Sequence, residues 1–137
     1  MSQQPALTFL VVDDDAIFHF LMMKLLERLG IPAHSVRTAL SGREALDLMV
    51  EAQLTGKAYP DFIMLDLNMP MMDGFAFLEA CHKLPERLPQ QVKIIIISSS
   101  LDKRDRDRAL HLGASHYLIK PVTETDLEAI LRSSESK

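Results

Sequence analysis

Short apolar segments alternate along the chain with longer segments in which apolar residues recur every three or four positions. The first pattern is typical of buried strands and the second of amphipathic helices. We expect strands at residues 7–12, 33–38, 62–65, 92–97 and 117–119. We expect helices at residues 18–29, 41–52, 75–84, 102–112 and 123–131. Their strict alternation predicts an α/β domain built on a parallel sheet.

The connections between the strands decide the architecture. Right-handed crossovers place helices on both faces, which gives a doubly wound five-stranded parallel sheet. The segment 92–97 is the most apolar, so it is expected near the centre of the sheet, whereas 33–38 is a weak strand. A chain of 137 residues without a repeat or a long linker predicts a single domain over 1–137, with a core from about 7 to 131. Polar tails are expected at residues 1–5 and 133–137.

Local motifs mark several helix ends. Asp15 follows the first strand and is expected to be a helix N-cap. Ser41 and Glu44 have the spacing of a capping box. Gly113 suits the C-terminal cap of the helix before it.

Five side chains with reactive or ionic groups lie where strands end. They are Asp13 and Asp14 after the first strand, Asp66 after the third, Ser98 at the fourth and Lys120 after the fifth. Ligands of open α/β sheets bind outside the carboxyl ends of the strands. Each residue alone also fits a simpler role, as a helix cap, a turn residue or a solvated strand end. Their shared position favours a site with three carboxylates, a hydroxyl and an ammonium.

Such a cluster suits phosphoryl chemistry. Carboxylates within roughly 4–6 Å of one another repel unless a cation intervenes. Mg²⁺ prefers hard oxygen ligands, including carboxylates and phosphate oxygens. Asp66 could then attack phosphorus as a nucleophile, while Ser98 and Lys120 bind the phosphoryl oxygens. The sequence has no glycine-rich loop of the GxxxxGK[ST] or GxGxxG type, so a nucleotide cradle is not expected.

The chain resembles the receiver domains of two-component response regulators from about residue 7 to 131. Four stretches carry the resemblance: 11–15 (VVDDD), 66–74 (DLNMPMMDG), 97–100 (ISSS) and 113–121 (GASHYLIKP). The second and fourth are highly specific in combination. The resemblance implies a flavodoxin-like (βα)5 fold with strand order 2-1-3-4-5.

The resemblance also implies roles for the residues at the metal and phosphoryl positions. Asp66 would be the phosphoacceptor and a metal ligand. Asp14 would bind Mg²⁺ directly, Asp13 would bind it through water, and Asn68 would contribute its backbone carbonyl. Mn²⁺ is a possible substitute for Mg²⁺.

Further roles follow from the same resemblance. Ser98 and Lys120 would contact the phosphoryl group, and Tyr117 would be a switch aromatic. Pro121 would follow a cis peptide bond, and Gly74 would be a structural residue of the loop. An aromatic at position 117 also fits plain packing. Three methionines, Met69, Met71 and Met72, fit loop packing better than a partner surface.

The function implied is a phosphorylation-activated signalling switch. A histidine kinase or histidine phosphotransfer protein would supply the phosphoryl group, and the face formed by helix 102–112, the fifth strand and the last helix would then regulate an unknown output protein. The charge run at 102–108 also fits a solvated face. The chain would not be an enzyme, beyond assisting its own phosphorylation and the hydrolysis of its aspartyl phosphate.

Composition narrows the possible partners and the location. The net charge is −4, and the sequence lacks the basic character typical of proteins that bind nucleic acid directly. No apolar run reaches the roughly 20 residues of a membrane span, so no membrane insertion and a cytoplasmic location are expected. The lone Cys81 falls in an apolar helical pattern and is expected to be a buried, inert thiol.

Other interpretations stay open at this point. Met1 and the polar tail favour a stand-alone receiver over a segment of a larger response regulator or hybrid kinase. An aspartate-nucleophile phosphatase is a distant alternative, because Asn68 stands where that class has a second aspartate. A flavodoxin-like cofactor binder shares the sheet plan, but the chain lacks tryptophan and a Ser/Thr-rich phosphate loop after the first strand.

Overall fold

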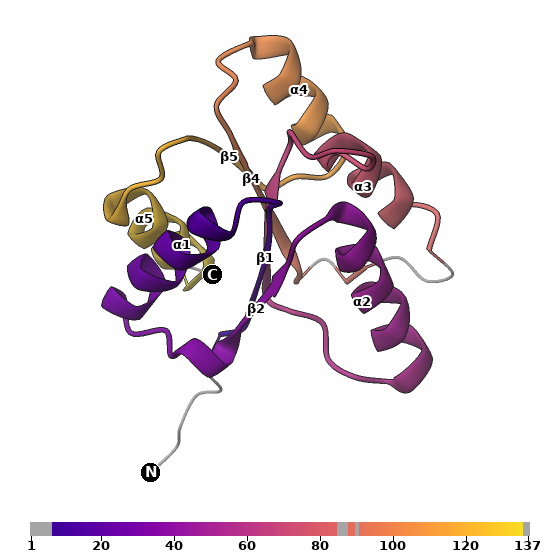
Figure 1. Cartoon of the computed structure of the whole chain (residues 1–137), viewed down its shortest axis with the longest axis horizontal. Helices are drawn as coiled ribbons and strands as arrows, with labels where there is room; N and C mark the ends of the chain where they lie inside the picture. The colour runs from indigo at the N-terminus through magenta and orange to yellow at the C-terminus, as the bar shows by residue number, and fades with distance from the viewer. Residues whose placement is uncertain (1–6, 85–87, 90, 136–137) are drawn as a thin grey trace.

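A computed structural model describes residues 7–84, 88–89 and 91–135 of the chain. Its centre is one parallel sheet of five strands in the order β2-β1-β3-β4-β5 (Figure 1). The strands are β1 (Phe9–Val12), β2 (Val36–Ala39), β3 (Phe62–Asp66), β4 (Lys93–Ser98) and β5 (His116–Ile119). The predicted fold and strand order are therefore confirmed.

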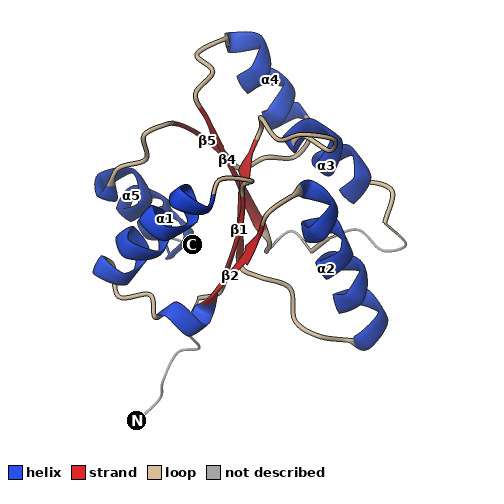
Figure 2. Cartoon of the chain, in the orientation of Figure 1, coloured by secondary structure: helices blue, strands red, loops and turns tan. Residues whose placement is uncertain are grey.

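Five α-helices cover the two faces of the sheet. They are α1 (Ala16–Arg28), α2 (Gly42–Thr55), α3 (Gly74–Cys81), α4 (Lys103–His111) and α5 (Glu124–Glu135). Helices α1 and α5 lie on one face, and α2, α3 and α4 lie on the other (Figure 2). The last helix continues past residue 131 into the segment expected to be a polar tail. The tail at residues 1–5 falls outside the described residues.

The alternation of side chains along the strands divides the core in two. In β1, Phe9 and Val11 pack against α1 and α5, while Leu10 and Val12 pack toward α2 and α3. Strands β1, β3 and β4 are buried on both faces, which explains their nearly continuous apolar sequence. The carboxyl ends of these strands are thereby held at fixed positions along one edge.

The second strand is shorter than predicted at its start. The prediction of 33–38 is wrong for the first three residues, because Ala33–Ser35 form a 3₁₀ turn called η1. The Ser35 N–H donates to the Pro32 carbonyl at 3.0 Å, which closes that turn. Strand β1 begins at Phe9, whose register partner is Val36, so the preceding residues have no strand to pair with.

The predicted helix ends are confirmed at three positions. Asp15 caps α1, since its carboxylate accepts the Ile17 N–H at 2.9 Å. Ser41 caps α2 and accepts the Glu44 N–H at 3.0 Å. Gly113 follows α4 with a φ of 109°, which a residue with a side chain rarely adopts.

The single cysteine, Cys81, is the last residue of α3 and is buried in the core. Burial raises the pKa of the Cys81 thiol to about 12, so the group stays protonated at neutral pH. The prediction of an inert thiol agrees with this environment. None of the helices in the described part of the chain is long and apolar enough to span a membrane.

Candidate metal and phosphoryl site

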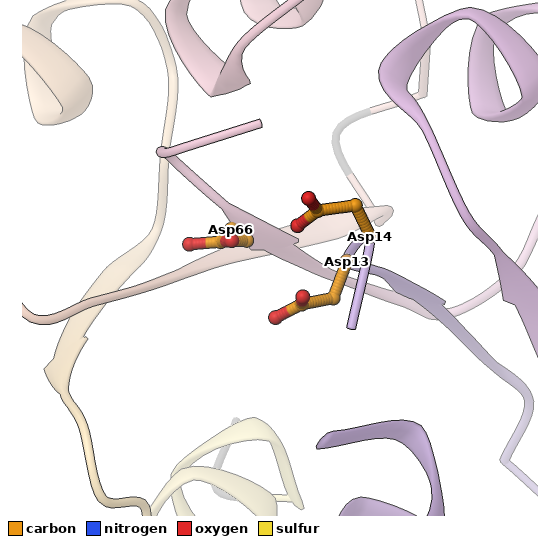
Figure 3. A group of neighbouring side chains, drawn as sticks. All are labelled: Asp13, Asp14 and Asp66. Atoms are coloured by element: carbon orange, nitrogen blue, oxygen red, sulfur yellow. The ribbon is translucent and has the colours of Figure 1, made fainter. Parts of the chain in front are cut away.

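Three aspartates meet at the carboxyl edge of the sheet (Figure 3). Asp13 directly follows β1, Asp14 is the next residue, and Asp66 is the last residue of β3. Carboxylate oxygens from all three lie within 4.8 Å of one another. The register explains why they converge. Val12 of β1 pairs with Leu65 of β3, so the residues that follow them, Asp13 and Asp66, lie side by side. The side chains of Asp13 and Asp66 are buried, whereas Asp14 is exposed.

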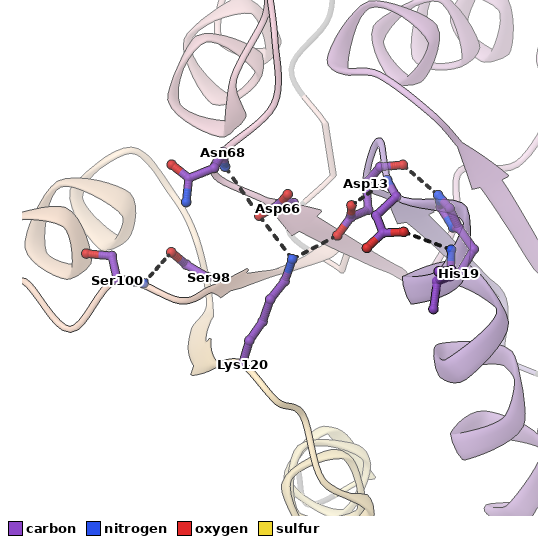
Figure 4. A network of polar contacts seen from close by, with 9 residues as sticks. Asp13, His19, Asp66, Asn68, Ser98, Ser100 and Lys120 are labelled. Atoms are coloured by element: carbon purple, nitrogen blue, oxygen red, sulfur yellow. Dashed lines mark hydrogen bonds and ion pairs between the residues drawn. The ribbon is translucent and has the colours of Figure 1, made fainter.

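Lys120 extends from the end of β5 into this cluster (Figure 4). Its Nζ lies 3.1 Å from Asp13 Oδ2 and 3.6 Å from Asp66 Oδ1. The same ammonium lies 4.7 Å from the centre of the Phe18 ring, within the range of a cation–π contact. The Lys120 N–H donates to the Ser98 carbonyl at 2.8 Å, and the Lys120–Pro121 peptide bond is cis. Lys120 therefore connects the end of β5 to the ends of three other strands, β1, β3 and β4.

The described residues around the site carry more negative than positive charge. Burial raises the pKa of Asp66, and the nearby Asp13 carboxylate raises it further, with a smaller contribution from Asp14. Lys120 and the Asn68 N–H, 3.3 Å from Asp66 Oδ1, act in the opposite direction but do not cancel the rise in pKa. Within the described residues, Lys120 is thus the only cation paired with a cluster of three carboxylates, and it contacts two of them, Asp13 and Asp66. A set of hard oxygen donors with excess negative charge fits a divalent cation such as Mg²⁺.

The fourth strand ends in a serine that is connected to α4. Ser98 is fully buried, and its Oγ accepts the Ser100 N–H at 3.0 Å. The Tyr117 hydroxyl donates to the Ser100 carbonyl at 3.2 Å, and the Ser100 hydroxyl donates to the Asp105 carboxylate of α4 at 2.7 Å. Among the described residues, no hydrogen bond joins Ser98 to the three aspartates. Ser100, which the sequence motifs did not single out as a site residue, joins Ser98, Tyr117 and α4.

The loop after β3 packs closely behind Asp66. Met69 is buried and Met72 packs against the core, as loop packing predicts. The prediction of loop packing is wrong for Met71, because its side chain is fully exposed. Its φ is 70°. The Gly74 N–H donates to the Leu67 carbonyl at 3.0 Å. A Cβ atom at Gly74 would lie 2.8 Å from the Asp66 carbonyl oxygen and 2.9 Å from Leu67 Cα.

Replacement of Gly74 by alanine is expected to destabilise the fold by about 2 kcal/mol, because the new methyl group meets backbone atoms that cannot move independently of Asp66. Urea denaturation of the wild-type and variant proteins measures the difference. An unchanged unfolding midpoint would show that the loop accommodates the methyl group, and the close contact would then not matter for the site.

Sequence reasoning missed His19, which lies on α1 and contacts the turn formed by Asp13, Asp14 and Asp15, here called the acidic turn. Its Nε2 lies 2.7 Å from the Asp13 carbonyl oxygen. The only signal in the sequence is its spacing: position 19 is three and seven residues before Met22 and Leu26, the other buried positions of α1. This spacing places His19 on the buried face of α1 and predicts a core residue. It does not predict the contact of its ring with the Asp13 carbonyl.

Comparison with known proteins assigns the class. The response regulator receiver domain family matches residues 9–132, so the chain belongs to that family. Receiver domains bind Mg²⁺ at an acidic pocket and act as phosphoacceptor switches rather than as conventional enzymes.

Individual relatives support the assignment. The probable transcriptional regulator ycf27 of Porphyridium aerugineum is 36% identical over 90% of this chain and 46% of its own length. The chain thus spans about half the length of the curated relatives it matches. The chemotaxis protein CheY4 of Vibrio cholerae has a similar structure, with a TM-score of 0.74, 28% identity, and coverage of 95% of this chain and 99% of that one. A two-component response regulator from Cytophaga hutchinsonii gives a TM-score of 0.82 at 25% identity, with 98% and 100% covered.

Proposed function

We propose that Asp66 is the phosphoacceptor of this receiver domain and that Asp13, Asp14 and Asp66 hold Mg²⁺ beside it, with the Asn68 carbonyl as a further ligand. The observation that supports this most directly is the cluster of three carboxylates, in which the buried Asp13 and Asp66 share Lys120 and the exposed Asp14 has no described partner. Residues 7–131 would form the single folded unit that carries the site. The histidine of a kinase or phosphotransfer protein would supply the phosphoryl group.

The chemistry requires one bond to form and one to break. An Asp66 oxygen attacks phosphorus while the bond between phosphorus and the donor's imidazole nitrogen breaks, and the imidazole leaves. Bound Mg²⁺ would neutralise the carboxylates and the incoming phosphoryl oxygens. Lys120 would exchange part of its contact with Asp13 and Asp66 for a phosphoryl oxygen. Hydrolysis would restore Asp66 when water attacks phosphorus, and the chain would assist only these two reactions.

Ser98 would bind the phosphoryl group and transmit the resulting change to the surface of the domain. Its Oγ accepts the Ser100 N–H, and no described residue accepts its hydroxyl proton, so the proton can be donated to a phosphoryl oxygen. A movement of Ser98 would displace Ser100, which also binds Tyr117 and the first turn of α4. This path supports a change in the face formed by α4, β5 and α5, where the output protein would bind.

Incubation with Mg²⁺ and acetyl phosphate, followed by intact-mass analysis, tests this function. We expect one phosphoryl adduct per chain, no adduct when EDTA replaces Mg²⁺, and no steady release of product from p-nitrophenyl phosphate. Continuous turnover of that ester without a stable adduct would support the phosphatase alternative instead.

Magnesium alone is expected to stabilise the protein. At ten times its dissociation constant, a ligand that binds only the folded state adds about 1.4 kcal/mol, which corresponds to roughly 5 °C in melting temperature for a domain of this size. The Asp14→Asn variant is the matched control, because the exposed Asp14 carboxylate makes no hydrogen bond or ion pair within the described part of the chain. A thermal shift in the wild type that persists in this variant would contradict the assignment of Asp14.

A second candidate is a receiver segment within a longer regulator. The observation that favours it is the greater length of the curated relatives, which are named as transcriptional regulators. Detection of the native protein by immunoblotting distinguishes the two. A band at the mass of this chain supports the stand-alone receiver, and a band near twice that mass supports the segment.

A further inference from the structure

His19 is buried on α1 and contacts the acidic turn through one ring nitrogen (Figure 4). Its Nε2 lies 2.7 Å from the Asp13 carbonyl oxygen. A carbonyl oxygen can only accept, so Nε2 must carry the proton. The other ring nitrogen, Nδ1, is buried and has no hydrogen-bond partner among the described residues.

The contacted carbonyl belongs to the peptide unit that joins the first two aspartates of the site. The remaining groups of Asp13 are already fixed: its N–H donates to Ala39 at 3.1 Å, and its Oδ1 accepts the Asp15 N–H at 2.8 Å. Asp14 differs, because its carboxylate forms no hydrogen bond to any described residue. The direction of the Asp14 side chain therefore depends on the orientation of the peptide unit that His19 holds.

Packing alone does not explain a histidine at this position. The other buried residues of α1 are Met22 and Leu26, both apolar. An unpaired polar atom in such an environment is destabilising, so a leucine would pack without that penalty. What the histidine provides is the hydrogen bond from Nε2 to the Asp13 carbonyl.

We propose that His19 is a positioning residue of the metal site, which orients the Asp13–Asp14 peptide unit, and with it the Asp14 carboxylate, toward Mg²⁺. The inference rests on the proposed function, because it matters only if these aspartates bind the ion. It predicts that a side chain able to donate from the Nε2 position preserves metal affinity, and that one unable to do so does not.

The test titrates Mg²⁺ alone into the full chain and follows the backbone amide resonances of the site by NMR. His19→Leu removes the donor, and His19→Asn places an amide only as far out as Nδ1. His19→Gln places an amide near Nε2. Residues that orient metal ligands typically contribute 10-fold or more to affinity, so we expect the dissociation constant to rise about 10-fold in the first two variants and to recover in His19→Gln.

His82→Leu is the matched control. His82 Nε2 also lies 2.7 Å from a backbone carbonyl, that of Leu112, but the contact joins the end of α3 to the end of α4. Its removal is expected to leave Mg²⁺ affinity unchanged. Melting temperatures measured in EDTA show whether each variant is folded. If His19→Leu is not folded, the Mg²⁺ dissociation constants of His19→Gln and His19→Asn are compared instead, and tighter binding by His19→Gln supports the inference.

Equal affinity in the wild type, His19→Leu and His19→Asn would overturn the inference while leaving the metal site intact. Loss of affinity in all three His19 variants, without recovery in His19→Gln, would also overturn it, because the residue would then serve packing only. Absence of Mg²⁺ binding by the wild type would overturn the proposed function and this inference together.

Discussion

Replacement of Lys120 by methionine is expected to lower the free energy of unfolding by about 2 kcal/mol in the absence of Mg²⁺, because two buried carboxylates lose their only described cation. Lys120 Nζ contacts both Asp13 and Asp66, whose side chains are 1% and 6% exposed. Removal of one partner from a buried ion pair typically costs 3–5 kcal/mol, and the partial exposure of Lys120 reduces this value. Methionine keeps the apolar stem of the side chain. Urea denaturation in EDTA measures the loss.

Lys103→Met serves as the matched control. Lys103 pairs with Asp107 at 3.6 Å on the exposed surface of α4, so its removal is expected to cost less than about 0.5 kcal/mol. Addition of Asp13→Asn to Lys120→Met should restore part of the lost stability, since one of the unpaired charges is removed. Equal effects of the Lys103 and Lys120 substitutions would show that the buried cluster is not held together by its lysine.

Replacement of Asp66 by asparagine is expected to raise the free energy of unfolding of the apo protein at neutral pH. Burial and the Asp13 charge raise the pKa of Asp66, so ionisation of this group opposes folding. Asparagine keeps an oxygen for Lys120 and the Asn68 N–H but removes the charge.

The pH dependence follows from the sign of that shift. Because the folded pKa lies above the unfolded pKa, the wild type loses stability as the pH rises from the unfolded value through the folded value. The advantage of Asp66→Asn should therefore be absent below the unfolded pKa of about 3.9, grow above it, and level off once the pH exceeds the folded pKa. Denaturation curves of both proteins between pH 3.5 and pH 7.5, roughly the range that the linkage spans, measure this difference. A constant difference across that range would contradict the assignment.

The sheet and the position of the site could be predicted because both depend on local patterns with a geometric consequence. Buried parallel strands are short and apolar, and their carboxyl ends must meet at one edge. Asp13, Asp66 and Lys120 therefore needed only the correct strand ends to be placed together. The prediction of 33–38 was wrong at its start because the pairing of Val36 with Phe9 is a long-range register, which no local pattern encodes.

The contacts that support the site could not be predicted in the same way. His19 occupies a core position of α1, and only the fold shows that its ring reaches the Asp13 carbonyl. Ser100 reads as a turn residue, yet its backbone and hydroxyl join Ser98, Tyr117 and Asp105. Both cases depend on side-chain directions in three dimensions rather than on residue type and spacing.

Borohydride reduction followed by peptide sequencing in the mass spectrometer tests the central claim most directly. An aspartyl phosphate is reduced to homoserine, so the position of homoserine marks the phosphorylated residue. After incubation with acetyl phosphate and Mg²⁺, we predict homoserine at position 66 alone, and none when EDTA is present. Homoserine at Asp13 or Asp14, or none at position 66 in a protein that carries a phosphoryl adduct, would contradict the account.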